Sequence, residues 1–412
     1  MAVMRRARRG RRPAVRVLRP RPSAPGVLQL VWRERHISRA EIARRLDLSR
    51  STVSEIVDDL LPTGLVAEVG AGPSQGGRRP IVLQFQDEAW GILGIDVGAA
   101  HVAAAVTDLR GRVLAWANRD HAVRDDPAGT LRAMRELSER CVEKWGGGAA
   151  RLLGAGVAVP SPVDPRSPGE LCDLILPAWR GVDLRRDLQA RYGIPVLVEN
   201  DANLGALAEH WWGAGRGVQD FTYVKVATGI GAGHIIGGEI YRGASGVAGE
   251  IGHLAIDPQG ARCVCGLRGC LTTLVGAAAL VERARALRPR HAGTAVPGHP
   301  SLAEIEDAAL AGDPLALQVV REAAGHLGVA ISGLINLMNP ARVIIGGGLT
   351  RLGEILLEPL RETVRSHTLV TSAAAAEIRA SALGARATAV GAATAVLQRA
   401  LADPTLFPAA AR

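Results

Sequence analysis

One short stretch of this chain gathers four side chains that bind soft metal ions. The spacing is H-x9-C-x-C-x4-C, formed by His253, Cys263, Cys265 and Cys270. Three thiolates and one imidazole are the closed tetrahedral set that Zn²⁺ prefers in structural sites, and they leave no position for a metal-bound water. Buried small hydrophobes or reactive thiols are the alternative, but clustered thiols in a cysteine-poor chain are typical of metal sites. We therefore predict structural zinc here and expect Cys141 and Cys172 to be core residues.

A second candidate site lies where a predicted strand runs into a predicted helix, over residues 195–203. The sequence places Asp201 at the strand end, where its carboxylate could act as a general base toward a sugar hydroxyl. Asn200 and Glu250 can bind neighbouring hydroxyl groups. The alternative is that Asp201 is an acidic helix cap with a structural role only.

Glycine-rich turns follow several predicted strands and could bring backbone N–H groups against the phosphates of a nucleotide. Asp96 stands at the first of these turns, as does an acid in actin-like ATPases that faces the metal ion of the nucleotide. Because glycine turns between strands are common, each turn also has an ordinary structural interpretation. The candidate nucleotide-binding residues are Asp96, Gly98, Thr228, Gly229, Gly231, Gly346 and Gly347.

Length and composition limit the class of protein. The chain has 412 residues, which is more than one hydrophobic core usually serves, so two or three domains are expected. A hydrophobic content of 48% with 22% charged residues is typical of a globular protein in water. No stretch is apolar enough to span a bilayer, and the N-terminus lacks the apolar block of a secretory signal. We expect a cytoplasmic protein that makes no contact with a membrane.

The net charge of +9 is concentrated at the N-terminus. Residues 1–33 hold ten arginines and no acid, so the rest of the chain is close to neutral. We expect residues 1–23 to form a basic, disordered tail that is attracted to phosphate. The alternatives are a solvated extension, an upstream choice of start codon or an organelle transit peptide.

Residues 24–86 have the pattern of a winged helix-turn-helix. A first helix is predicted from Pro25 to Arg35. Ser38 and Glu41 form a capping-box pattern before a helix that ends at Leu46, and Ser49 caps a further helix to about Leu61. Asp47 stands in the tight turn, where its backbone would adopt the left-handed geometry that Asp tolerates. This spacing is that of a helix-turn-helix.

Two alternating segments, 65–69 and 80–83, read as the strands of a wing. The glycine- and proline-rich segment between them carries two arginines that could enter a minor groove. The second helix of the pair offers a polar N-terminus for base edges and phosphates of a major groove. The alternative is a helical hairpin that contacts protein. The candidate DNA-binding residues are Arg50, Ser51, Thr52, Ser54, Arg78 and Arg79.

Taken in order, these motifs resemble the ROK family, the repressors, open reading frames and kinases that bind sugars. The motifs that carry the resemblance are Glu199-Asn-Asp-Ala-Asn203, Gly249-Glu-Ile-Gly-His253 and Cys263-Val-Cys-Gly-Leu-Arg-Gly-Cys270. The resemblance implies an α/β fold in which residues 88–412 form an actin-like, ribonuclease H-like domain of two lobes. It also implies sugar contacts from Asn200, Asp201, Glu250 and His253, with Asp201 the catalytic base in kinases. The winged helix-turn-helix matches the repressor branch.

Three departures from the kinases of this family bear on activity. Thr272 follows Leu271 where the kinases have a glutamate that holds the sugar, and Ser161 replaces a glycine between Pro160 and Pro162. Ala100 replaces a threonine at the end of the first phosphate loop. These changes weaken the case for phosphorylation with ATP and Mg²⁺, and for the usual hexose specificity.

The leading hypothesis is a transcriptional regulator, most simply a repressor that a sugar or sugar phosphate releases from its operator. A homodimer, or a dimer of dimers, would read an inverted repeat in double-stranded DNA. Sugar binding between the lobes would change the spacing of the two DNA-reading domains, provided that it favours one arrangement. The rivals are an ATP-dependent sugar kinase with an appended DNA-binding domain, and a regulator with a vestigial sugar site that senses a partner protein.

Overall fold

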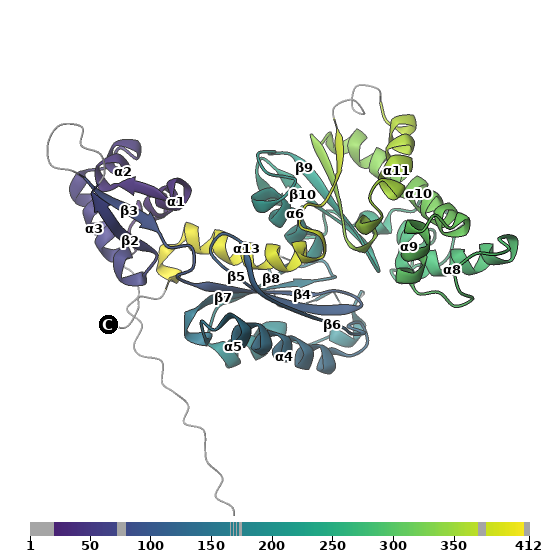
Figure 1. The fold of residues 1–412 in the computed structure, drawn as a ribbon, viewed down its shortest axis with the longest axis horizontal. Coiled ribbons are helices and arrows are strands. Elements are labelled where there is room, and N and C mark those ends of the chain that lie inside the picture. Colours follow the sequence, from purple (N-terminus) through teal and green to yellow (C-terminus); the bar gives the residue numbers. More distant parts are fainter. Residues whose placement is uncertain are drawn as a thin grey trace, which may run out of the picture.

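The computed structural model describes residues 20–407, apart from 72–79, 165, 168, 170, 173–174 and 370–375. An N-terminal winged helix-turn-helix is followed by two lobes, each built on a five-stranded sheet (Figure 1). The predicted mixed α/β class is confirmed. Residues 1–19 of the expected basic tail lie outside the described residues.

The N-terminal domain, called the head below, has the predicted helix order. Its elements are α1 (Ala24–Glu34), β1 (His36–Ser38), α2 (Arg39–Arg45), α3 (Arg50–Leu60), β2 (Val66–Ala71) and β3 (Ile81–Phe85), with the strands in the order β1-β3-β2.

Side-chain caps set the starts of the two helices of the motif. The Ser38 hydroxyl accepts a hydrogen bond from the Glu41 amide at 3.2 Å, and the Ser49 hydroxyl accepts one from the Thr52 amide at 3.0 Å. Asp47 has a φ of 52°, the left-handed geometry expected for the turn. The capping box is only half formed, because the Glu41 carboxylate binds Arg44 and Arg45 and not the Ser38 amide. The short strand β1 was not predicted.

The first lobe is a sheet in the order β6-β5-β4-β7-β8, with α4 and α5 on its outer face (Figure 1). The bounds are β4 (Gly91–Val97), β5 (His101–Thr107), β6 (Val113–Asp120), α4 (Pro127–Trp145), β7 (Leu152–Val159), α5 (Leu184–Tyr192) and β8 (Val196–Asn200). Strands β4 and β7 are buried along their whole length, as their largely apolar sequences require, and Asp96 is the charged residue of β4.

The second lobe repeats this topology in the order β11-β10-β9-β12-β13. Its elements are β9 (Phe221–Val226), β10 (Ile230–Ile236), β11 (Glu239–Tyr241), α7 (Thr272–Val275), α8 (Ala277–Leu287), α9 (Leu302–Leu310), α10 (Pro314–Met338), β12 (Arg342–Gly346), α11 (Glu354–His367) and β13 (Glu377–Ala380). In both lobes, three antiparallel strands are continued by two parallel ones. This duplication is the two-lobed architecture that the resemblance implied.

Two helices lie between the sheets and join the lobes. Helix α6 (Asp201–Trp212) packs on β9 and β10, and α13 (Ala387–Ala402) packs on β4 and β7 (Figure 1). They cross where Gly391 lies against the carbonyl of Leu204, and a Cβ at Gly391 would clash with that carbonyl. The close crossing therefore couples the position of one lobe to that of the other.

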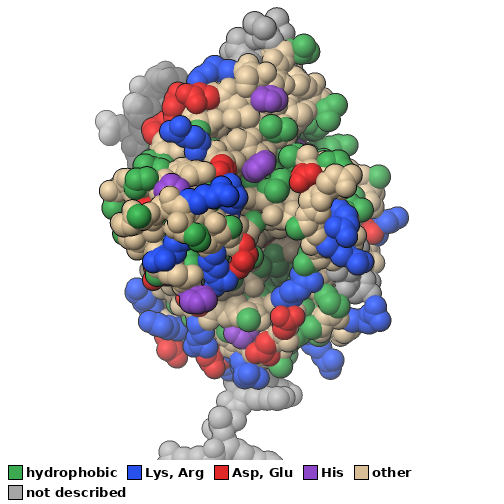
Figure 2. All heavy atoms as spheres, turned by 90° about the vertical axis from the view of Figure 1, so that its right-hand side faces the viewer, with side chains coloured by type: hydrophobic (Ala, Val, Ile, Leu, Met, Phe, Trp, Pro, Cys, Tyr) green, Lys and Arg blue, Asp and Glu red, His purple; other side chains and the backbone are tan. Residues whose placement is uncertain are grey.

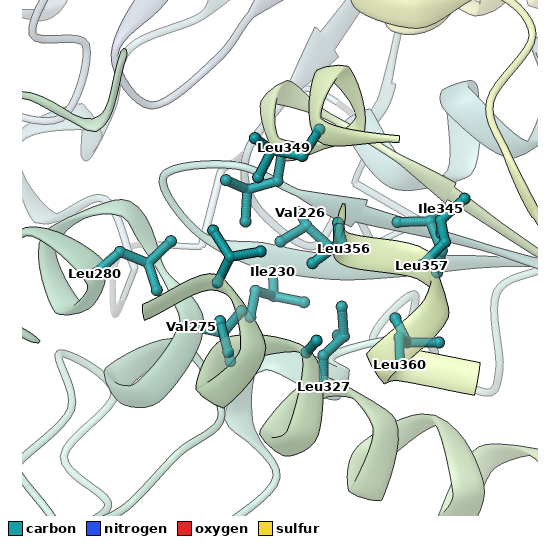
Figure 3. Close-up of a cluster of buried hydrophobic side chains, with 14 of the residues drawn as sticks. Val226, Ile230, Val275, Leu280, Leu327, Ile345, Leu349, Leu356, Leu357 and Leu360 are labelled. Atoms are coloured by element: carbon teal, nitrogen blue, oxygen red, sulfur yellow. The ribbon is translucent and has the colours of Figure 1, made fainter. Parts of the chain in front are cut away.

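A hydrophobic core fixes the elements behind the metal-ligand segment. Val226 and Ile230, at the ends of β9 and β10, pack with Val275 of α7 and Leu280 of α8 (Figure 3). Helix α10 contributes Leu327 from below. Because α7 begins just after Cys270, this core holds one end of the cysteine segment in place.

The head shares its core with the first lobe. Residues of α1, α3, β2 and β3 belong to one buried cluster together with Trp90, Ile92 and the C-terminal half of α13. The indole of Trp32 in α1 donates to the carbonyl of Leu109 at 3.0 Å, and the Arg110 guanidinium lies 4.4 Å from the centre of that ring. The head therefore docks through apolar packing as well as through its chain connection. No helix in the described part of the chain has both the length and the hydrophobicity that a membrane crossing requires.

Candidate functional site

A cavity of about 1090 Å³ lies at the junction of the two lobes and the cysteine segment. The face drawn in Figure 2 is hollowed near its centre, and charged side chains of both signs surround the hollow. The predicted residues that line the cavity are Gly98, Asn200, Asp201, Thr228, Gly229, Gly231, Glu250, His253 and Cys263. A volume of this size is enough for a sugar together with further ligand groups.

Asn200 and Asp201 reach the cavity because β8 ends where α6 begins. The Asn200 side chain caps α6 by accepting from the amides of Ala202 at 2.9 Å and Asn203 at 3.1 Å. It also donates to the carbonyl of Ser161 at 3.2 Å. The second hydrogen of its amide group is therefore the one that can serve a ligand.

Asp201 has a partner that sequence reasoning missed. The Lys225 ammonium of β9 donates to Asp201 Oδ2 at 2.8 Å and lies 3.8 Å from Asp96 Oδ1. Lys225 is 8% exposed and also lines the cavity. The sequence did contain a sign that Lys225 is unusual. The chain has only two lysines, Lys144 and Lys225, and the second interrupts an otherwise uncharged strand.

Glu250 and His253 approach each other at the edge of the cavity. The Glu250 carboxylate lies 3.9 Å from Nε2 of His253. Burial, with a smaller effect from the charge of Asp201, raises the pKa of Glu250 to about 7. Thr272, which stands where family kinases have a glutamate, also lines the cavity and offers a hydroxyl in place of a carboxylate.

The four predicted metal ligands come together. The ligand atoms of His253, Cys263, Cys265 and Cys270 all lie within 4.8 Å of one another. Sγ of Cys263 is 3.6 Å from Nδ1 of His253, and the sulfur atoms of Cys265 and Cys270 are 3.7 Å apart. A tetrahedral zinc site with bonds of about 2.3 Å has sulfur–sulfur edges of about 3.8 Å. The donor set and its spacing therefore fit a metal ion, with Nε2 of His253 left to face Glu250.

The candidate nucleotide-binding residues separate into two groups. Gly98, Thr228, Gly229 and Gly231 line the cavity, as described above. Gly346 and Gly347 are not among the lining residues, and a Cβ at these positions would clash with the Tyr223 side chain and the Val226 backbone. The close packing of β12 on β9 thus explains why both positions are glycine. Asp96 is buried at the end of β4, where His101 Nε2 lies 3.1 Å from its Oδ2.

The start of α3 presents the candidate DNA-binding groups of the head. Arg50 and Ser51 are exposed, whereas Thr52 and Ser54 are half-buried. The Ser49 hydroxyl lies 2.8 Å from the hydroxyls of both Ser51 and Thr52, so these side chains form one polar cluster. Arg78 and Arg79 of the wing lie outside the described residues.

Arg21, which sequence reasoning assigned to the tail, belongs to the head. Its guanidinium pairs with Glu55 at 2.7 Å and Asp59 at 2.9 Å, and both acids lie on α3. Arg21 thus braces, from a position before α1, the helix that carries the candidate DNA contacts.

Comparisons with known proteins agree with this architecture. The model of the ROK family matches residues 92–399, and a winged helix-turn-helix DNA-binding model matches residues 26–66. The xylose repressor of Caldicellulosiruptor bescii is 33% identical over 92% of this chain and 96% of its own length.

Solved structures give the same result. A ROK family transcriptional regulator, a homologue of the E. coli MLC protein, has a TM-score of 0.77 and 28% identity over 93% of this chain and 97% of its own. A ROK family glucokinase from Streptomyces griseus, in complex with glucose and AMPPNP, has a TM-score of 0.68 and 32% identity. The match covers 75% of this chain and 99% of the glucokinase. From the family model and the full-length relative, this chain belongs to the ROK family.

Proposed function

We propose that this protein is a sugar-responsive DNA-binding transcriptional repressor. The observation that carries the proposal is the presence, in one chain, of a winged helix-turn-helix that shares a hydrophobic core with the first lobe and of a cavity at the junction of the two lobes. The relatives that match nearly the whole chain include a xylose repressor and a transcriptional regulator, whereas the glucokinase matches 75% of it.

In the head, Arg50, Ser51, Thr52 and Ser54 would contact the major groove of an operator. The wing arginines Arg78 and Arg79 would reach the minor groove beside it. A homodimer would present two such heads to an inverted repeat, because the symmetry of the protein matches that of its DNA.

In the cavity, Asn200, Asp201, Glu250 and His253 would bind the hydroxyl groups of a sugar or sugar phosphate. His253 would also hold zinc with Cys263, Cys265 and Cys270. The metal would supply a structural cross-link, since the four protein ligands complete a tetrahedral shell. The chain's own residues would do the binding, and the cross-link would fix the segment that carries Glu250.

Helix α6 offers a physical route between the two sites. It begins at Asp201 in the cavity and ends at Trp212, beside the head. The rings of Trp211 and Trp212 lie 5.5 Å and 6.3 Å from the ring of Trp32 in α1. A ligand that favours one position of α6 would therefore favour one position of the head.

The proposal is tested by selecting genomic DNA fragments with the immobilised full-length, zinc-loaded protein. The bound fragments are then eluted with single pentoses, hexoses, amino sugars or their phosphates. We expect a small set of fragments with a shared inverted repeat, and elution by one class of sugar. Recovery of random DNA, or the same elution by every sugar and by buffer, would count against a sugar-responsive repressor.

A further inference from the structure

Lys225 places a positive charge in the lining of the cavity, on a strand whose other residues are uncharged. Its neighbours on β9, Val224 and Val226, are both fully buried. A buried ammonium is costly unless it is paired. Since the chain otherwise uses arginine for nearly all its basic residues, the compact ammonium group is a specific choice at this point.

The partners of Lys225 are two carboxylates, of which Asp201 lines the cavity and Asp96 is buried behind it. One is Asp201 at the start of α6, at 2.8 Å, and the other is Asp96 at the end of β4, at 3.8 Å. The second oxygen of Asp96 lies 3.1 Å from His101 Nε2. Burial alone would raise the pKa of Asp96, but the charge of Lys225 and the hydrogen bond with His101 outweigh burial, and the pKa is lowered. Burial likewise opposes the charge of Lys225, yet the two carboxylates raise its pKa.

These two carboxylates are the groups that a sugar kinase of this fold would need for its reaction. Asp201 would accept the proton of the sugar hydroxyl, but its Oδ2 already accepts a hydrogen bond from the Lys225 ammonium. Asp96 would face the Mg²⁺ of the nucleotide, but an ammonium and an imidazole flank its two oxygens. A divalent cation entering here would be repelled by Lys225 at short range. The residues present therefore do not fit a Mg²⁺–nucleotide complex.

We propose that the Lys225 ammonium takes the place of the divalent metal ion beside Asp96 and also holds Asp201, the residue that would be the catalytic base of a kinase. The cavity would then bind sugar without phosphorylating it. This inference rests on the proposed sugar site. Lys225 is a positioning residue: it holds Asp201 as a hydrogen-bond acceptor for the ligand and ties α6 to the first lobe. Its remaining N–H donors can serve a ligand hydroxyl, because an ammonium has three.

The experiment measures Mn²⁺ binding, as a stand-in for Mg²⁺, by the loss of the free Mn²⁺ signal in electron paramagnetic resonance. It uses full-length, zinc-loaded protein, and needs neither sugar nor DNA. We expect no Mn²⁺ binding to the wild-type protein. Lys225→Met keeps the length of the side chain but removes its charge, and should bind Mn²⁺ on the order of a hundredfold more tightly.

Two controls separate this role from a structural one. Lys144→Met makes the same change at an exposed position and should behave as wild type. Lys225→Met/Asp96→Asn has the charge balance of the wild-type site but lacks the cation, and should lose the gained Mn²⁺ binding. Zinc content and melting temperature report whether each variant is folded.

Tight Mn²⁺ binding by the wild-type protein, or sugar-dependent consumption of Mg²⁺–ATP by it, would overturn the proposal, even if Lys225→Met does not fold. A folded Lys225→Met variant that binds no Mn²⁺ would overturn it as well. This test uses no DNA, so it is independent of the repressor function. If the repressor function alone were wrong, the protein would still exclude Mn²⁺ but would select no operator from genomic DNA.

Discussion

At the scale of single residues, the zinc candidates and the sugar candidates meet at His253. Nδ1 of this residue lies 3.6 Å from the sulfur of Cys263, while Nε2 lies 3.9 Å from Glu250. A metal ion bound by the first nitrogen would fix the ring and so orient the second toward the cavity. Loss of the metal should therefore affect the ligand site and not only the stability of the cysteine segment.

Replacing one metal ligand tests this link. We expect Cys265→Ser to lose its zinc, because a hydroxyl is a poor substitute for a thiolate, and to lose sugar binding with it. Cys172→Ser, which changes a half-buried cysteine outside the cluster, should keep about one zinc per chain. Elemental analysis measures the zinc content of each variant, and calorimetry measures its affinity for sugar. Full sugar affinity in a zinc-free Cys265→Ser protein would break the link.

Asp201 should act as a hydrogen-bond acceptor and not as a base. Asp201→Asn should weaken sugar binding by ~1.5–3 kcal/mol, the usual contribution of a hydrogen bond to a charged group. Operator binding without sugar should be unchanged, because the head lies at the other end of α6. Calorimetry and DNA-binding titration check the two halves. Wild-type phosphorylation of a sugar that disappears in this variant would instead identify a catalytic base.

The residue scale also shows what the sequence could predict. The metal ligands lie within 18 residues of one another, so their spacing in the sequence was enough to predict that they come together. Lys225, Asp96 and Asp201 come from three different elements, β9, β4 and α6, and only the arrangement of the two lobes makes them neighbours. The sequence alone could show that Lys225 interrupts an uncharged strand, but without the topology it could not show that Asp96 and Asp201 are its partners.

At the scale of elements, the helices of the head were predicted well because their starts carry local signals. Ser38 and Ser49 cap α2 and α3 through hydrogen bonds to residues three positions later. Strand β1 was missed because three residues hold no clear alternation, and its pairing with β3 is a long-range contact. Arg21 was assigned to the tail because its partners on α3 lie more than 30 residues away.

The exposed start of α3 gives a direct test of the head. Arg50→Ala should weaken binding to the cognate operator by ~1–3 kcal/mol if the guanidinium contacts a base. Binding to unrelated DNA should change much less. Arg365→Ala, at an exposed position of α11 in the second lobe, is the control. Titration of labelled duplexes at one salt concentration makes the comparison, and equal losses on cognate and unrelated DNA would assign Arg50 to a phosphate.

At the scale of the whole molecule, the head is joined to the lobes by aromatic packing at the end of α6. Trp212 packs against Trp32 of the head and donates to the Thr394 hydroxyl of α13 at 2.8 Å, and the C-terminal half of α13 lies in the same buried cluster as the head. The family resemblance predicted the two lobes and the winged domain, but not this contact. Its residues come from α1, α6 and α13, and no sequence spacing joins them.

We expect Trp211→Ala to uncouple the two sites. Loss of the ring removes its packing against Trp32, so sugar and operator should each still bind while their mutual effect, typically ~1–3 kcal/mol, falls toward zero. Trp116→Ala, on β6 of the first lobe, is the matched control and should keep the coupling. Operator affinities with and without sugar give the coupling for each protein. An undiminished sugar effect in Trp211→Ala would exclude this route.

The central claim is that sugar in the cavity changes the affinity of the head for DNA. It is tested most directly by fluorescence anisotropy of the selected operator with the full-length, zinc-loaded protein, in the presence and absence of a sugar shown to bind by calorimetry. We expect the sugar to weaken operator binding by ~5–150-fold at constant salt, with no consumption of ATP. A sugar that binds the protein but leaves the operator affinity unchanged would contradict the claim.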